Sequence, residues 1–246
     1  MISYNRIKRI SSIQPEILQK ISTMGFVGVE FGQLHNENPR ELRKMMDDLG
    51  LQYVATHLDA LPKPKDMKAV LDFEEELGNK TIIIPYWNGV QLSSEPGVKK
   101  MVEEFNQAVP TIKEYGMRMG FHNHCEEFLF KFNGKTVHQL FMEQVDPSIF
   151  AEVDIYWAQT AGEDPATILR SLGKRAPFLH IKDGPCLPDQ PMVAVGKGKV
   201  DIKGTLRDNS AEWHTLELDC CATDMFVAIE ESYKFLTTNG LSKGKV

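Results

Sequence analysis

The sequence of 246 residues predicts an α/β fold, a (β/α)8 or TIM barrel, in which the whole chain, residues 1–246, forms a single domain. Short apolar strands alternate along the chain with amphipathic helices, and most of these helices stop at a glycine. The strands recur at intervals close to the roughly 30 residues of one βα unit in such a barrel. A doubly wound open sheet is the alternative, but it would normally carry a G-x-G-x-x-G turn that this sequence lacks.

The first two predicted helices show the recurring unit most clearly. Residues 39–49 form one helix, with Asn38 as its N-cap and Gly50 as a stop that tolerates the left-handed conformation. Residues 15–24 repeat the device and end at Gly25. In both segments, apolar residues recur at i, i+3, i+4 and i+7, which marks one buried helical face.

Each helix is followed by a strand, and this order predicts parallel strands joined by crossover helices. Seven strands are clear, whereas the first of the expected eight is weak or degenerate, with Ile7–Ile10 as its candidate. The clear strands lie within residues 26–31, 51–57, 81–87, 117–124, 151–157, 176–184 and 215–219.

Composition excludes several classes of partner. The formal net charge of −6 and the pI near 5.7 argue against electrostatic binding of nucleic acid or an anionic membrane. No apolar run approaches the roughly 20 residues that a membrane helix needs. We therefore expect a small-molecule partner and no nucleic-acid or membrane partner, and a homo-oligomer remains open beside a monomer.

The cysteines and the N-terminal segment bear on location. None of the four cysteines belongs to a C-x-x-C pair, so we expect reduced thiols in a reducing compartment. The start of the chain is basic and has no acidic residue before Glu16, as in a transit peptide. It runs directly into a helix that the barrel needs, so a cytoplasmic protein is the expectation.

Polar side chains stand where the predicted strands end. In a parallel barrel the carboxyl ends of the strands face the active site, and several strands contribute catalytic groups. A single histidine at such a place is often a plain core residue, but several converging on one mouth predict a site. They are Glu30, His57, His122, Asn123, His124, Asp154, His180, Lys182 and Glu217.

Asp154 is the clearest of these candidates, because it interrupts a strand that should be buried on both faces. A buried carboxylate needs a cation or several donors, and the cation is either a metal ion or a neighbour such as Lys182. Glu217 and His180 interrupt their strands in the same way. Two carboxylates with one or two imidazoles predict one divalent metal ion, Mn, Zn, Co or Fe, rather than Ca.

These strand ends resemble those of the sugar phosphate isomerase/epimerase superfamily, whose members are xylose isomerase-like barrels. The matching motifs are HNHxxEF at residues 122–128, DxYW at 154–157 and HIKDG at 180–184, in the superfamily's order and spacing. The resemblance extends over residues 25 to about 236. These motifs are specific for the superfamily but not for one reaction.

The resemblance implies a metal ion held by four residues at the ends of strands five to eight. In the best-known epimerases these residues are Glu, Asp, His and Glu, and the last three match this sequence residue for residue. His122 stands where the first glutamate is expected, and Glu126 or Glu127 in the following loop is the alternative source of that ligand. The implied ligands are His122, Asp154, His180 and Glu217.

The resemblance also implies roles in catalysis and substrate binding. The expected base is Glu217, while His124 and Lys182 return the proton or polarise the carbonyl. The residues expected to bind the substrate are Glu30, His57 and Trp157. The last of these replaces a histidine of some relatives and would stack on the apolar face of a sugar. If these residues have only structural roles, Glu30 and His57 would form hydrogen bonds that stabilise loops at the barrel rim, and Trp157 would pack there as an aromatic side chain.

The implied function is isomerisation or epimerisation of a small keto-sugar, or of a sugar derivative, through an enediolate. Because the epimerases use their first glutamate as a second base, its replacement by His122 makes dehydratase or lyase chemistry on a keto-sugar or polyol the main rival. A non-catalytic sugar-binding barrel is a further alternative. An endonuclease IV-like repair enzyme is disfavoured by the seven histidines and the negative charge.

The loop VGKGKVD, residues 195–201, offers a candidate phosphate site. Barrels often bind phosphate near the loops after strands seven and eight, and Gly196 and Gly198 could expose backbone N–H groups beside Lys197 or Lys199. A surface turn with solvated lysines is the commoner explanation of such a sequence. We therefore do not predict that the substrate carries phosphate.

Overall fold

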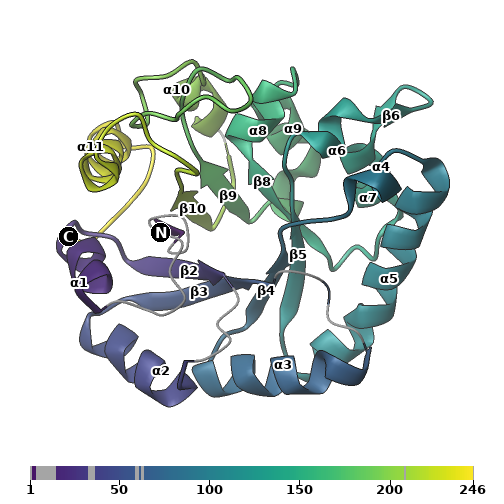
Figure 1. Cartoon of the computed structure of the whole chain (residues 1–246), viewed down its shortest axis with the longest axis horizontal. Coiled ribbons are helices and arrows are strands. Elements are labelled where there is room, and N and C mark those ends of the chain that lie inside the picture. The colour runs from purple at the N-terminus through teal and green to yellow at the C-terminus, as the bar shows by residue number, and fades with distance from the viewer. Residues whose placement is uncertain are drawn as a thin grey trace.

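The computed structural model describes residues 2–3, 15–32, 37–58, 61, 64–207 and 209–245. Its centre is a closed barrel of parallel strands in the order β1-β10-β9-β8-β5-β4-β3-β2, and helices surround it (Figure 1). The predicted α/β barrel is therefore confirmed. The barrel strands are β1 (Ile2–Ser3), β2 (Gly28–Gly32), β3 (Gln52–His57), β4 (Thr81–Ile84), β5 (Arg118–His122), β8 (Phe150–Asp154), β9 (Phe178–Ile181) and β10 (Trp213–Leu216).

Helices follow the strands, and a small hairpin of β6 (Lys131–Phe132) and β7 (Lys135–Thr136) lies outside the barrel. None of the described helices is long and apolar enough to cross a membrane. The helices are α1 (Pro15–Thr23), α2 (Pro39–Asp48), α3 (Pro64–Leu77), α4 (Gly89–Leu92), α5 (Glu95–Glu114), α6 (Glu126–Leu129), α7 (Val137–Gln144), α8 (Ile155–Thr160), α9 (Pro165–Leu172), η1 (Gly173–Arg175), α10 (Ile202–Leu206) and α11 (Met225–Thr238).

The first strand is short, as predicted, and closes the barrel. In β1, Ile2 pairs with Leu216 of β10 on one side and with Val29 of β2 on the other. A strand of two residues gives the ladder few hydrogen bonds, which explains its weak sequence signal. The candidate stretch Ile7–Ile10 lies outside the described residues.

Local sequence explains where α2 begins and ends. The Asn38 side chain accepts hydrogen bonds from the backbone N–H groups of Arg40 and Glu41, while Pro39 occupies the first turn. Gly50 follows the helix with a φ of 59°, which glycine adopts at little cost. The predicted cap and stop are confirmed here.

Side chains on alternate strand residues fill the barrel in layers, because successive residues of a strand point to opposite faces. The layer nearest the amino ends of the strands is apolar: the rings of Phe150 and Phe178 lie 5.2 Å apart, and Trp213 packs against the same cluster. Two residues further along these strands stand Glu152, His180 and Thr215, all fully buried. Two residues further again stand Asp154, Lys182 and Glu217.

Some predicted strands are shorter than the apolar runs that suggested them. The strand expected over 151–157 ends at Asp154, whose carboxylate accepts from the backbone N–H of Trp157 and starts α8. Likewise β5 ends at His122, so His124 lies in the loop beyond it. Side chains from these two loops therefore reach the mouth from outside the sheet.

We predict that Gly120→Ala destabilises the barrel by about 1–3 kcal/mol, because an added Cβ would collide with the ring of Phe150 on the neighbouring strand. Urea denaturation would measure the change in the free energy of unfolding. Gly89→Ala is the matched control, since a Cβ at that position meets nothing within 4 Å. Equal stability of the two variants would contradict this account of the inner layer.

Candidate active site

The polar residues predicted at the strand ends gather at the carboxyl end of the barrel. Asp154 closes β8, Glu217 directly follows β10, and His180 lies within β9. His57 closes β3, and Glu30 lies in β2. Five different strands thus contribute side chains to one buried cluster.

Three residues form what we call the outer set: Asp154, His180 and Glu217. Their potential ligand atoms all lie within 4.8 Å of one another. His180 Nδ1 lies 2.8 Å from Glu217 Oε2. These are three of the four metal ligands that the sequence predicted, and the fold brings them together.

The side chain of Lys182 is fully buried and lies against the carboxylates of the outer set. Its Nζ lies 2.9 Å from Asp154 Oδ2, 2.7 Å from Glu217 Oε2 and 3.1 Å from Asp219 Oδ2. Burial lowers the pKa of Lys182, but the neighbouring carboxylates, led by that of Asp154, outweigh burial and raise it well above its ordinary value. Lys182 is therefore a permanent cation. It forms the ion pair with Asp154 that the sequence allowed as the alternative to a metal ion.

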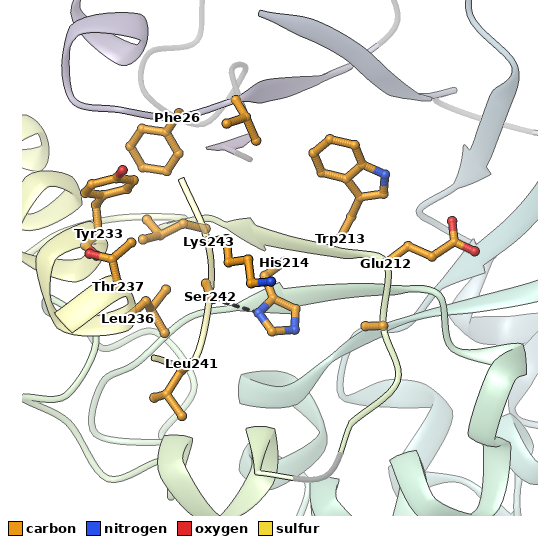
Figure 2. A pocket seen from close by; sticks show the side chains of 13 residues that line it. Phe26, Glu212, Trp213, His214, Tyr233, Leu236, Thr237, Leu241, Ser242 and Lys243 are labelled. Carbon is orange, nitrogen blue, oxygen red and sulfur yellow. Dashed lines mark hydrogen bonds between the residues drawn. The ribbon is translucent and has the colours of Figure 1, made fainter. Parts of the chain in front are cut away.

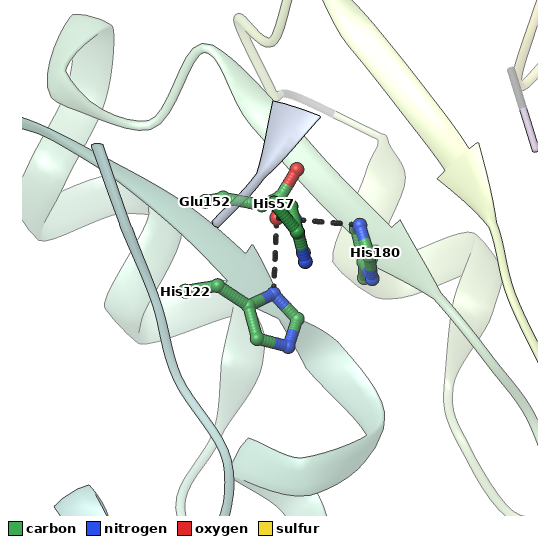
Figure 3. A group of neighbouring side chains, drawn as sticks. All are labelled: His57, His122, Glu152 and His180. Carbon is green, nitrogen blue, oxygen red and sulfur yellow. Dashed lines mark hydrogen bonds and ion pairs between the residues drawn. The ribbon is translucent and has the colours of Figure 1, made fainter. Parts of the chain in front are cut away.

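A second group, which we call the inner set, consists of His57, His122, Glu152 and His180 (Figure 3). Its centre is Glu152 Oε2, which lies 2.6 Å from His57 Nε2, 3.1 Å from His122 Nδ1 and 3.3 Å from His180 Nε2. The carboxylate of Glu30 adds a second acceptor, 2.6 Å from His57 Nε2 and 2.9 Å from His180 Nε2. This set lies one layer deeper in the barrel.

The carboxylates of the inner layer set the charges of their histidines. Burial lowers the pKa of His57, but the carboxylates of Glu30 and Glu152 outweigh it and raise that pKa to about 9. Burial would raise the pKa of Glu30, yet the imidazoles of His57 and His180 hold it well below its ordinary value. In this layer the ionised carboxylate of Glu30 is therefore balanced by the imidazolium group of His57.

Two histidines connect the inner and outer sets through opposite ring nitrogens. His180 directs Nε2 to Glu30 and Nδ1 to Glu217. His122 directs Nδ1 to Glu152, while its Nε2 lies 3.9 Å from Asp154 Oδ2. Metal-binding histidines generally donate their second N–H to a carboxylate, which fixes the ring and leaves the other nitrogen as the ligand. The inner carboxylates are placed to do this for both rings.

The donor set fits a divalent metal ion. Glu152 Oε1 is buried and accepts no hydrogen bond within the described part of the chain, while Asp154 Oδ2 meets the Lys182 ammonium at 2.9 Å and lies 3.9 Å from His122 Nε2. Burial, followed by the positive charges nearby, lowers the pKa of His122 well below its ordinary value, which leaves the neutral form that ligates metals. An ion at the outer set would share the Asp154 and Glu217 carboxylates with Lys182.

The alternative first ligands are not part of either set in the described residues. Glu127 is buried, and its carboxylate accepts a hydrogen bond of 2.8 Å from the backbone N–H of His124. Burial raises the pKa of Glu127 to about 7. Its neighbour Glu126 forms part of the rim. His122 is therefore the first-ligand candidate that the geometry favours.

A family model described as a xylose isomerase-like TIM barrel matches residues 18–218. The chain belongs to this family. The superfamily expected from the strand-end motifs is thereby confirmed.

Known proteins similar to this xylose isomerase-like barrel include inosose dehydratases and sugar isomerases or epimerases. Inosose dehydratase of Geobacillus kaustophilus is 20% identical over 195 residues, which are 69% of this chain and 62% of that protein. The chain thus spans less than two thirds of the length of the curated relatives it matches.

Solved structures share the fold over nearly the whole chain. A sugar phosphate isomerase/epimerase of Parabacteroides distasonis aligns with a TM-score of 0.81 at 20% identity, covering 98% of this chain and 94% of that one. L-ribulose 3-epimerase aligns with a TM-score of 0.74 at 15% identity, covering 96% and 93%. At such identities the likeness shows a common architecture.

Sequence reasoning missed three acidic residues of this xylose isomerase-like barrel. Glu152 and Asp219 belong to the polar cluster, and each lies two residues from a predicted ligand, Asp154 or Glu217. The strand period of two was the available signal, because residues at i and i+2 point to the same side of a strand. The third missed residue is Asp183.

Asp183 organises the loop that offered a candidate phosphate site. Its Oδ2 accepts hydrogen bonds of 2.9 Å from the backbone N–H groups of both Gly196 and Gly198. Its Oδ1 accepts from the N–H groups of Gly184 and Val200. The two glycine N–H groups are therefore used inside the protein, and Lys197 forms an ion pair with Glu231. The structural explanation of this loop, rather than phosphate binding, is the one that the geometry supports.

The remaining predicted residues lie at the rim. The ring of His124 lies 4.9 Å from that of His122, and Lys182 Nζ lies 5.8 Å from the ring centroid of Trp157. The indole Nε1 of Trp157 has no hydrogen-bonding partner among the described residues. Both side chains flank the outer set, where a substrate would enter.

A separate hollow of about 370 Å³ lies at the opposite end of the barrel, where β2 and β10 begin. Figure 2 shows Phe26, Trp213 and Tyr233 around it, with His214 Nδ1 2.7 Å from the hydroxyl of Ser242. Active sites of such barrels lie at the carboxyl ends of the strands. This hollow is therefore not the candidate site.

We predict that Asp183→Asn loosens the loop of residues 195–200. An amide NH₂ group would replace one carboxylate oxygen, so backbone N–H groups would lose their acceptor. Each lost acceptor should lower the free energy of unfolding by about 1–3 kcal/mol. Hydrogen exchange should speed up at the amides of Gly196 and Gly198. The control is Asp201→Asn, which keeps an equivalent N-cap on α10. Unchanged protection of both glycines in Asp183→Asn would refute the role of this carboxylate.

Proposed function

We propose that this barrel is a metal-dependent isomerase or epimerase that acts on a small keto-sugar or sugar derivative through an enediolate of the substrate. The observation that carries the proposal is the environment of Glu217. Its carboxylate stands at the barrel mouth, 2.7 Å from the Lys182 ammonium and 2.8 Å from His180 Nδ1. A carboxylate fixed there can take a proton from the carbon next to a carbonyl, and the neighbouring cation can stabilise the negative charge that develops on the substrate.

One divalent ion, Mn, Zn, Co or Fe, completes the proposed centre. The residues that would hold it are His122, Asp154, His180 and Glu217. When bound, such an ion polarises a carbonyl oxygen and stabilises developing negative charge. Glu30 and Glu152 would orient the two imidazoles from the inner layer.

The chain's own groups would move the protons. Glu217 accepts the proton from the carbon beside the carbonyl. Lys182 stabilises the negative charge that develops on the substrate oxygen, and His124 at the rim returns a proton. Return to the neighbouring carbon gives an isomer, and return to the opposite face of the same carbon gives an epimer.

Substrate binding is assigned to the rim and to the deeper imidazole. Trp157 offers its ring to the apolar face of the sugar, and its N–H, which has no partner among the described residues, to a hydroxyl. His57, whose side chain is 14% exposed, reaches the site from β3. Glu30 is 1% exposed and engaged with His57 and His180, so we propose that it assists substrate binding through these rings.

Dehydration is a second candidate, favoured by two specific observations. The curated relatives are inosose dehydratases, and His122 stands where two-base epimerases carry a glutamate. In this reaction Glu217 removes the proton beside the carbonyl, and the hydroxyl on the next carbon leaves as water after protonation by His124. The product is an α,β-unsaturated ketone, whose ultraviolet absorption distinguishes dehydration from isomerisation.

The cellular setting is inferred from the thiols. All four cysteines are free thiols. Free thiols of this kind fit a reducing compartment. We therefore propose that the enzyme works in the cytoplasm on a small carbohydrate.

We predict that Glu217→Gln slows exchange of the substrate's α-proton with solvent by about 10²–10⁴-fold, the usual contribution of a general base. The exchange would be followed by NMR in D₂O with a panel of ketohexoses and keto-polyols. Glu212→Gln is the matched control, because Glu212 lies at the other end of β10 and pairs with Arg118. Full exchange in Glu217→Gln would remove the assigned base, and no exchange by the wild type would remove the proposed function.

Metal content gives a test that does not depend on turnover. We expect about one ion per chain in the wild type by elemental analysis. Asp154→Asn should lose it, although asparagine still caps α8. Glu152→Gln should weaken metal affinity by about 10–100-fold, as expected for a partner that orients a ligand. Stoichiometric metal in Asp154→Asn would sink the ligand assignment.

A further inference from the structure

A hollow beside the candidate site is not used by the chemistry described so far. It measures about 220 Å³ and is lined by Tyr86, Trp87, Gly89, His124, Glu126 and Glu127. These residues follow the neighbouring strands β4 and β5, so they belong to the same mouth of the barrel as the outer set. Figure 1 shows α4 and α6, which carry part of this lining, next to each other.

The hollow lies next to the proposed site, on the side of His124. The imidazole of His124 lines the hollow, and its ring lies 4.9 Å from that of His122. The hollow is therefore the space next to a molecule that reacts at the outer set. Any group attached to the reacting sugar on this side would enter the hollow.

Trp87 provides a rigid wall with an open donor. Its side chain is 8% exposed and its ring packs 5.6 Å from that of Phe105. Yet its indole Nε1 has no hydrogen-bonding partner in the described residues. A buried donor without a partner is costly, so an acceptor from a bound molecule would relieve it.

The other residues that line the hollow indicate which kind of molecule could bind in it. Tyr86 is 61% exposed and offers an aromatic face to a molecule above it. Glu126 and Glu127 bring carboxyl acceptors, and among the described residues neither a lysine nor an arginine lines the hollow. These acceptors disfavour a phosphate or carboxylate group, and an entirely apolar group would leave the polar atoms unpaired. A neutral ring with apolar faces and many hydroxyls meets all of these conditions.

We infer that this hollow is a subsite for a second sugar ring, so that the substrate is a glycoside of a keto-sugar rather than a free monosaccharide. The inference rests on the proposed function, because it assumes that a keto-sugar reacts at the outer set. The volume of the hollow, about 220 Å³, lies below the range of about 300–1,000 Å³ for pockets that hold whole drug-sized ligands, so it suits one added ring and no more.

The test compares a ketohexose with its glucosides. Fructose, turanose, maltulose and isomaltulose share the same ketose, and the last three carry glucose on O3, O4 and O6. Isothermal titration with the metal-loaded protein should show at least one disaccharide binding about tenfold more tightly than fructose. Equal or weaker binding of all three disaccharides would overturn the subsite.

Variants localise the preference to the hollow. Tyr86→Ala and Trp87→Phe should each reduce the ratio of disaccharide affinity to fructose affinity by about three- to tenfold. Val90→Ala is the control, because Val90 lies on α4 shortly after these residues, is 80% exposed and does not line the hollow. A ratio unchanged in both lining variants would place the second ring elsewhere and overturn the inference.

The subsite and the proposed function fail in different ways. Proton exchange with free ketohexoses, lost in Glu217→Gln, tests the chemistry at the outer set and does not involve the hollow. Exchange without any preference for a disaccharide would leave the proposed function standing and remove the subsite. Preferential binding of a disaccharide without exchange would keep the subsite and remove the proposed reaction.

Discussion

His180 is held from both sides of its ring, and the two polar layers of the barrel are joined through it. Its Nε2 meets the Glu30 carboxylate and its Nδ1 meets that of Glu217, while β8 supplies Glu152. These partners come from strands far apart in the chain, so only a closed barrel brings them to one imidazole. The register of β9 between β8 and β10 is therefore a condition for the whole site.

Charge balance explains why so many acids can be buried together. Glu30, Glu152 and Asp154 are at most 1% exposed, and an isolated carboxylate in such a place would cost several kcal/mol. Lys182 and the imidazolium groups of His57 and His180 compensate them. A divalent ion at the outer set would add positive charge beside Lys182 and displace protons from ligating histidines. Metal binding and protonation are thus linked within one cluster.

The barrel separates stability from chemistry along its axis. Apolar rings close the end where the strands begin, and this layer needs no polar partner. Above it, each step of two residues along a strand brings another polar side chain into the interior. The loop after β9 is fixed by Asp183 through four backbone N–H groups, which holds the residues that follow Lys182 in place. A rigid surrounding of this kind favours pre-organised catalysis.

The sequence by itself determined the helix ends, the parallel strands and the candidate ligands, because capping residues, glycine stops and apolar periodicity act over a few residues. It indicated Asp154, His180 and Glu217, since each interrupts an apolar strand. Only the tertiary structure decided which charges pair. Glu152 gave no separate signal, and its role depends on imidazoles from three other strands. The use of the loop glycines by Asp183 was also hidden, because strand register and loop closure set distances between residues remote in the chain.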